Sequence, residues 1–208
     1  MKNRKKDLTY LAQLAMLICI QMVMRAMGLG SVPVGPLVMS FLTLPIAVGA
    51  ITLGPLAGAV LGGVFGFYSL YDAITAKSAM TGIFFNLNPI STFVLCVVMR
   101  VLMGFCTGLL FELIQKFDKK HTWSYLVGSV AAPVLNTFFF MGYIVLFFYG
   151  TEYVQGLVTK VGATNPIMFV ILLVGVQGLI EACVCGLLGA AVCKALSVAF
   201  NGKLAFSA

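Results

Sequence analysis

PISTFVLCVVMRVLMGFCTGLLFELIQ, from Pro89 to Gln115, is the stretch that decides the fold. Crossing the hydrocarbon core of a bilayer takes about 20 consecutive apolar residues, and this run is longer than that. It predicts a membrane-spanning helix. Arg100 lies in its middle.

Arg100 is costly at that depth. A guanidinium at mid-membrane costs about 2.5–3.5 kcal/mol on insertion scales, and arginine does not lose its proton in proteins. The residue therefore needs an anionic partner, a wet cavity or both. Two interpretations follow: a structural ion pair, or a binding site for a solute that carries a carboxylate.

The composition of the whole chain agrees with a membrane protein. Of its 208 residues, 61% are hydrophobic and 9% are charged, and the mean hydropathy is +1.08. These values predict one all-α domain over residues 1–208, a multi-pass membrane protein. No phosphate-binding loop occurs, since Gly202-Lys203 precedes Leu204 and lacks the upstream pattern. Energy from ATP would have to come from another chain.

Charge and cysteine usage exclude other classes. The net charge of +7 gathers at helix ends and forms no stripe with aromatic residues, so we expect no nucleic-acid partner. One histidine, His121 in a short loop, cannot complete a metal site with the cysteines, and we expect no metal and no cofactor. We interpret the cysteines as small packing residues. They are Cys19, Cys96, Cys106, Cys183, Cys185 and Cys193.

Hydrophobic runs predict a compact bundle of six transmembrane helices. The basic N-terminal residues precede a run of about 20 residues without a small-x-small cleavage pattern, so we interpret it as a retained first helix and not a signal peptide. Prolines stand near the first turn of several spans. The six spans are Leu8–Met27, Leu37–Leu53, Gly54–Ile74, Ile90–Gln115, Trp123–Tyr149 and Pro166–Ala199.

Basic residues in short loops predict the orientation. They concentrate in the N-terminal tail, in the loop Lys116–Thr122 and at the C-terminal end, whereas the opposite side has Arg25, Lys77 and Lys160. Both termini are therefore expected in the cytoplasm, which requires an even number of spans. The outer loops are the longer ones and are expected to cover an outward-facing pocket. One of them contains Phe84–Pro89, a mixture of aromatic and amide side chains that suits a lid.

Glycines mark one face of the third span. Gly54, Gly58 and Gly62 recur every four residues, which predicts close helix–helix packing.

These stretches carry a resemblance. Val32-Pro33-Val34-Gly35-Pro36, Leu44–Ile51, Leu53-Gly54-Pro55 and Gly58–Gly66 together resemble the substrate-binding (S) components of energy-coupling factor (ECF) transporters, and within them the pantothenate-type branch. The turn and glycine ladder occur in several branches, so they identify the superfamily better than the vitamin.

The resemblance implies a function and partners. An S component binds a vitamin from outside, docks onto a transmembrane coupling subunit driven by two cytoplasmic ATPase subunits, and topples to release the vitamin inside. The family docks through Ala-x-x-x-Ala on the first helix. This chain has Ala12-x-x-Ala15, with Ala15 and Cys19 as a small-x-x-x-small approximation.

Pantothenate has a carboxylate, an amide and two hydroxyls, and its site needs an apolar wall for the gem-dimethyl carbon. Arg100 suits the carboxylate. Asn136 suits the hydroxyls and the amide, and the resemblance implies an arginine and an asparagine on these two helices. An interhelical hydrogen bond is the alternative role for Asn136. Gln177 shares a helix face with Glu181 and is the third candidate.

Further candidates line the same region. Tyr68 and Tyr143 are expected to form pocket wall, and Asn86 belongs to the lid sequence. Glu181 is expected to be a counter-ion of Arg100, and full neutralisation would remove the attraction for an anion. Asp72 is interpreted as an interfacial charge.

Other functions fit less well. An S component for a different vitamin or a nucleobase-like precursor is the main alternative, although a ligand without a carboxylate has little use for Arg100. A membrane-embedded enzyme would need a catalytic motif such as H-E-x-x-H or G-x-S-x-G, and neither occurs. A stand-alone channel or structural subunit is the remaining alternative, but six short helices with one buried cation offer no conductive path.

Overall fold

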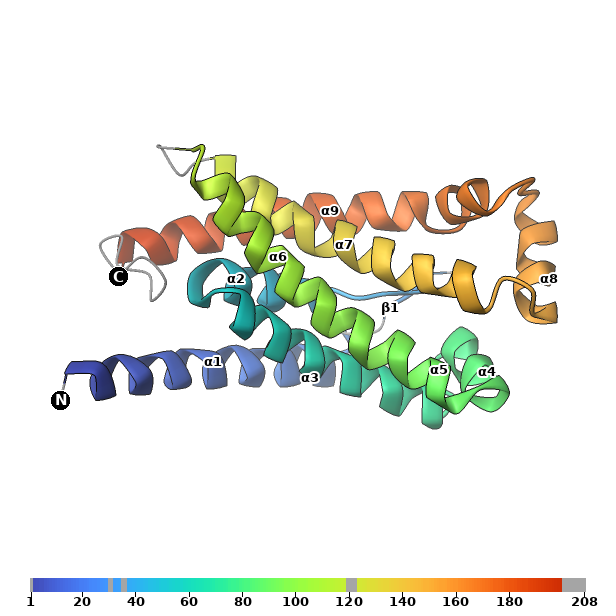
Figure 1. Cartoon of the computed structure of the whole chain (residues 1–208), viewed down its shortest axis with the longest axis horizontal. Coiled ribbons are helices and arrows are strands. Elements are labelled where there is room, and N and C mark those ends of the chain that lie inside the picture. Colours follow the sequence, from blue (N-terminus) through green and yellow to red (C-terminus); the bar gives the residue numbers. More distant parts are fainter. Residues whose placement is uncertain (1, 30–31, 35–36, 119–122, 200–208) are drawn as a thin grey trace.

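A computed structural model describes residues 2–29, 32–34, 37–118 and 123–199, with side chains from residue 7 onward except at 32–39. Within these ranges the chain is helical apart from one short hairpin (Figure 1). Five helical segments are long and apolar enough to cross a membrane. They are α1 (Lys2–Ala26), α3 (Pro55–Ile74), the continuous segment Pro89–Gln115, α7 (Trp123–Phe147) and α9 (Pro166–Ala199).

The second predicted span is wrong in its first half. Residues Leu37–Met39 form strand β2, which pairs antiparallel with β1 (Val32–Val34). Helix α2 begins at Thr43 and ends at Leu53. Its 11 residues rise roughly 16 Å at 1.5 Å each, against a hydrocarbon core of about 30 Å. β-Branched residues and prolines favour extended backbone before α2.

Two predicted outer loops also contain helices. α4 (Ala79–Leu87) follows α3, and α8 (Glu152–Val161) follows α7. α8 has Glu152 in its first turn and Lys160 in its last, which suits the helix dipole. Gly162 ends it with a φ of 68°, a left-handed conformation that glycine adopts without strain. Both helices lie at the end of the molecule opposite the start of α1 (Figure 1).

Proline begins three long helical segments as predicted: Pro55, Pro89 and Pro166 are the first residues of α3, α5 (Pro89–Phe93) and α9. Pro36 lies outside the described residues. A π-helical turn, η1 (Val94–Val98), follows α5, and α6 (Met99–Gln115) completes the segment. Arg100 is thus the second residue after a widened turn.

The predicted glycine packing is confirmed between α3 and α6. A Cβ atom at Gly58 would lie 2.3 Å from the Gly104 carbonyl oxygen, and one at Gly62 would lie 2.2 Å from the carbonyl oxygen of Arg100. Gly54 serves instead as the turn between α2 and α3, with a φ of 97°. The two backbones therefore touch, and the position of Arg100 depends on the missing side chain at Gly62.

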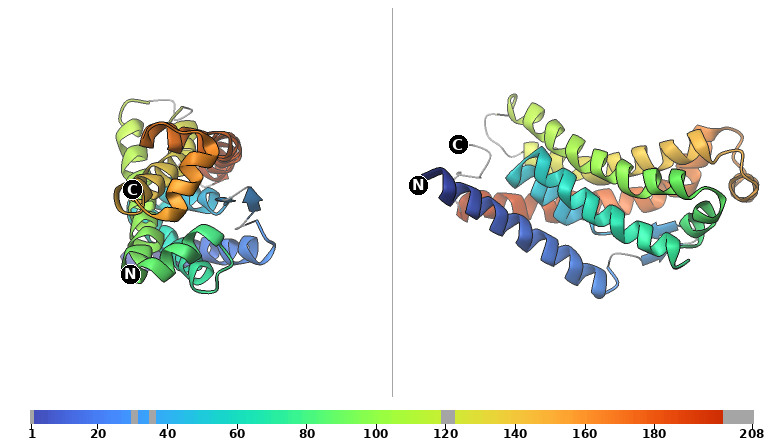
Figure 2. Two further views of the ribbon diagram at one scale, coloured as in Figure 1. Left: turned by 90° about the vertical axis from the view of Figure 1, so that its right-hand side faces the viewer. Right: turned by 60° about the horizontal axis from the view of Figure 1, so that its bottom comes forward.

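Helix α1 lies along one side of the bundle and buries little of its surface (Figure 2). Gln21 is fully buried and donates from Nε2 to the carbonyl oxygens of Leu42, at 3.5 Å, and Leu61, at 3.3 Å. Most other α1 side chains remain exposed, including Leu8, Leu11 and Met16. These polar contacts, together with Leu14, Leu17, Ile18 and Met24, which pack against the core, hold α1 against the bundle.

Candidate functional site

A polar cavity of about 90 Å³ lies between α3, α6, α7 and α9. The end of α1 and the start of α4 also contribute to its lining. Four predicted site residues line it: Tyr68, Arg100, Asn136 and Gln177. The other lining residues are Arg25, Ser40, Phe65, Ser69, Asp72, Ser78, Met80, Thr81, Thr137, Phe140, Met141, Val174 and Glu181.

Two aromatic rings hold the Arg100 guanidinium. Its Cζ atom lies 4.4 Å from the centroid of Phe65 and 4.8 Å from that of Phe140, distances typical of cation–π contacts. Nη1 donates to the carbonyl oxygens of Leu95 and Cys96, at 3.4 Å and 3.3 Å. Both carbonyls belong to η1, the kind of widened turn that often marks a functional site.

Arg100 is 7% exposed and its Nε has no hydrogen-bond partner. Among the side chains that the structure describes, the one cation–carboxylate pair within 4.0 Å joins Arg25 to Asp72. Arg100 thus has no such pair with Glu181. The guanidinium is desolvated and stacked, and its bonds go to neutral carbonyls.

Glu181, on α9, has a different partner from the one expected. Its Oε1 accepts a 2.8 Å hydrogen bond from the backbone N–H of Ser40, which ties α9 to the residue after β2. Gln177 also interacts with this carboxylate, as their spacing of one helical turn predicts. Glu181 is 3% exposed, so it adds a carboxylate to the cavity without pairing directly with Arg100.

Two amide oxygens are left without partners. Asn136 Oδ1 on α7 and Gln177 Oε1 on α9 are buried, and neither accepts a hydrogen bond within the protein. An unsatisfied buried oxygen costs about 1–3 kcal/mol. Both residues line the cavity with Arg100. A bound molecule that donates hydrogen bonds would satisfy these atoms.

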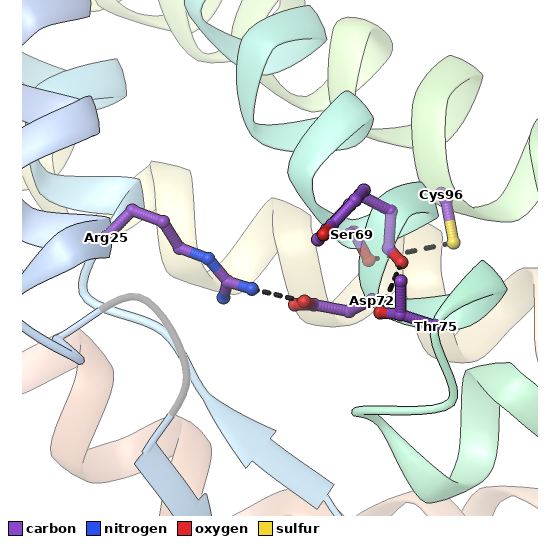
Figure 3. Close-up of polar contacts among 6 residues, drawn as sticks. Arg25, Ser69, Asp72, Thr75 and Cys96 are labelled. Carbon is purple, nitrogen blue, oxygen red and sulfur yellow. Dashed lines mark hydrogen bonds and ion pairs between the residues drawn. The ribbon is translucent and has the colours of Figure 1, made fainter.

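The cavity also meets an ion pair that the sequence did not predict. Arg25, at the end of α1, pairs with Asp72 near the end of α3, beside Ser69, which contacts Cys96 (Figure 3). The sequence places Arg25 on the outer side and Asp72 at the membrane interface. Each is a lone charge near the end of an apolar helix, and nothing in that pattern identifies the other as its partner.

Two predicted residues lie elsewhere. Tyr143 is buried in an apolar cluster and stacks on Phe147 with ring centroids 4.3 Å apart. Tyr143 is on the same face of α7 as Asn136, but it lies two helical turns farther along the helix and therefore beyond the cavity. Asn86 is exposed on α4; the start of that helix, through Ser78, Met80 and Thr81, lines the cavity instead.

The three predicted docking residues, Ala12, Ala15 and Cys19, are all exposed on α1. Their side chains are small, and α1 is the long helix with the smallest buried share. This surface is open to lipid or to another protein.

Sequence reasoning missed most of the neutral lining. Ser69 and Thr137 are polar residues within apolar spans and gave a usable signal. Phe65, Phe140, Met141 and Val174 gave none, because apolar side chains that face a cavity resemble those that face lipid.

Comparison with known proteins identifies the family. Residues 9–192 match the family described as "ECF transporter, substrate-specific component", and the chain belongs to this family. This family consists of substrate-binding components of transporters, and the five apolar helices agree with a multi-pass membrane protein. Members of the family act with a coupling component and ATPases.

One solved structure similar to this chain is ThiT from Listeria monocytogenes. The TM-score is 0.61 at 19% sequence identity, and the match covers 91% of this chain and 96% of that one. At this identity the similarity shows the fold alone. No curated protein sequence matches the chain.

Proposed function

We propose that this chain is the high-affinity pantothenate-binding subunit of a vitamin importer. The observation that carries the proposal is Arg100, a buried cation without a carboxylate within 4.0 Å that lines a cavity together with two unpartnered amide oxygens. A single carboxylate at Arg100 and donors facing Asn136 and Gln177 would satisfy all three. Pantothenate has that combination in one small molecule.

The guanidinium is prepared for such a ligand. Phe65 and Phe140 stack against it and restrict its plane, so less rotamer entropy is lost on binding. The contacts to Leu95 and Cys96 are long, and a carboxylate would form a shorter, charge-assisted pair.

A second candidate is a different vitamin or a nucleobase-like precursor, and Glu181 favours it. This carboxylate lines the cavity, and the Arg25–Asp72 pair adds no net charge. A ligand with donors and no carboxylate would bond to Glu181, Asn136 and Gln177 and make little use of Arg100.

Binding titrations with Arg100→Ala test the proposal. A charge-assisted hydrogen bond contributes about 1.5–3 kcal/mol net, and 1.4 kcal/mol is a factor of ten. Pantothenate affinity should therefore fall about tenfold to a hundredfold. Arg100→Lys should rescue it poorly, because lysine lacks the planar fork.

The alcohol analogue pantothenol is the control ligand, since it lacks the carboxylate. It should bind the native protein weakly and distinguish little between native protein and Arg100→Ala. Equal native affinities for acid and alcohol would contradict the proposal. A melting temperature measured for each variant separates loss of binding from loss of fold.

The proposed topology has six crossings, with α2 as the short one and both termini in the cytoplasm. Support comes from the clustering of basic residues and from the start of α1 and the end of α9, which lie at the same end of the molecule (Figure 1). Accessibility mapping with a reporter at Ser207 tests it. A reporter signal from outside would contradict the proposal.

A further inference from the structure

A second hollow lies on the lipid-facing side of the same helices. It is a groove of about 630 Å³ between α7 and α9, and of all the side chains along it only that of Thr137 is polar. Its rim is strongly exposed: Phe138 is 68%, Ile171 62% and Leu179 67% exposed. In a membrane this rim faces the acyl chains.

The groove and the polar cavity share a wall. Thr137, Met141 and Val174 line both, so a single layer of side chains separates them. Met141 is an unbranched, flexible side chain and forms part of the wall between the two spaces.

The polar cavity is too small for its expected occupant. Sites for small molecules measure about 300–1,000 Å³, and this cavity measures about 90 Å³. Widening between α3 and α6 is blocked, because their backbones already touch and a Cβ at Gly62 or Gly104 would collide with the other helix. The groove is the adjacent space that already exists.

Three glycines line the groove although a larger side chain would fit at each position. A Cβ at Gly142 would meet nothing within 4 Å, and one at Gly175 would meet only Ile171 Cγ2, at 3.9 Å. A Cβ at Gly178 would lie 3.8 Å from Thr137 Oγ1, an ordinary contact. None of the three has a positive φ. This sets them apart from Gly58, Gly62 and Gly104.

We propose that ligand binding opens the seam between α7 and α9, so that the polar cavity merges with the groove and the branched apolar carbon of the ligand occupies it. This inference rests on the proposed function: Arg100 holds the carboxylate, and the gem-dimethyl carbon of pantothenate takes the place beyond Met141. The seam is then the part of the site that selects for a branched apolar group.

A reversible cross-link across the seam tests the proposal. The Thr137→Cys/Gly178→Cys double variant puts two thiols across the seam, within reach of a disulfide after a small shift. The disulfide formed on oxidation would hold the seam closed, and its reduction would release the seam. The reduced protein is therefore the control for the oxidised one. The native chain, with its six free cysteines, is oxidised in parallel.

We expect the oxidised double variant to bind pantothenate at least about tenfold more weakly than its reduced form, with native affinity unchanged by oxidation. Gly175→Leu should also weaken binding, because leucine fills the groove. Val176→Leu, next to it but outside the groove and 76% exposed, should not.

The outcomes separate the two proposals. If the native protein binds pantothenate and the oxidised form binds it equally well, the seam does not open, lipid alone covers the groove, and the inference is overturned. If the native protein binds no pantothenate, the proposed function fails first and the proposed occupant of the groove fails with it.

Discussion

At the residue scale, the arrangement around Arg100 bears on the choice between a structural ion pair and a ligand-binding role. A structural ion pair requires a carboxylate beside the guanidinium, and among the described residues none lies within 4.0 Å. Glu181 accepts from the Ser40 N–H instead, and Asp72 pairs with Arg25. The charge of Arg100 is balanced by aromatic faces and backbone carbonyls, an incomplete solution that leaves its Nε unbonded.

The stacking predicts a measurable effect of Phe140. We expect Phe140→Leu to weaken pantothenate binding, but less than Arg100→Ala does, because a cation–π contact contributes about 0.5–2 kcal/mol and the cation itself remains. Titration calorimetry on the purified variants measures this. Phe93→Leu, a substitution at a half-exposed ring outside the cavity, serves as control. A Phe140→Leu affinity equal to that of Phe93→Leu would mean that the ring does not position Arg100.

At the element scale, α3 and α6 behave as one unit. Their backbones touch at Gly58, Gly62 and Gly104, and the same stretch of α6 carries Arg100. A substitution in α3 therefore changes the site without contacting a ligand.

Two neighbouring glycines in α3 give a matched comparison. Gly62→Ala should destabilise the protein by about 1–3 kcal/mol, as overpacking does, and lower ligand affinity through displacement of Arg100. Gly63→Ala should be neutral or slightly stabilising, since its Cβ would meet only Val101 Cγ2 at 3.4 Å and alanine favours the helix. Thermal unfolding in detergent measures both. Equal melting temperatures for the two variants would contradict the close approach.

At the scale of the whole molecule, α1 is the element free to engage another protein. It is held by apolar side chains that pack against the core, among them Leu14, Leu17 and Ile18, and by Gln21 and the Arg25–Asp72 pair in its last two turns. Ala12, Ala15 and Cys19 stay exposed, so we expect this face to meet a partner without disturbing the cavity.

A bulky residue on that face should separate binding from assembly. Ala15→Leu should leave pantothenate affinity unchanged and weaken co-purification with the coupling subunit, because close backbone approach needs small side chains. Ala191→Leu, at an exposed alanine of α9, is the matched control. Normal assembly of Ala15→Leu would place the docking surface elsewhere.

The sequence by itself determined the properties that depend on the surrounding solvent. Long apolar runs identified five of the six predicted spans. Pro55, Pro89 and Pro166 indicated helix starts, and the spacing of Gly58 and Gly62 indicated a close-packing face. It also singled out Arg100, Asn136 and Gln177, because a polar group is conspicuous within a span. Each of these signals is local and can be read along the chain.

Only the tertiary structure decided which groups meet. In the structure, Arg25 pairs with Asp72, and Glu181 accepts a hydrogen bond from the Ser40 N–H. Tyr143 lies away from the cavity, and Leu37–Met39 form part of a hairpin. Lipid and protein interior are equally apolar, so hydropathy does not tell a side chain that faces a neighbouring helix from one that faces the bilayer. Partner choice depends on which helices become neighbours, and that is a property of the assembled bundle.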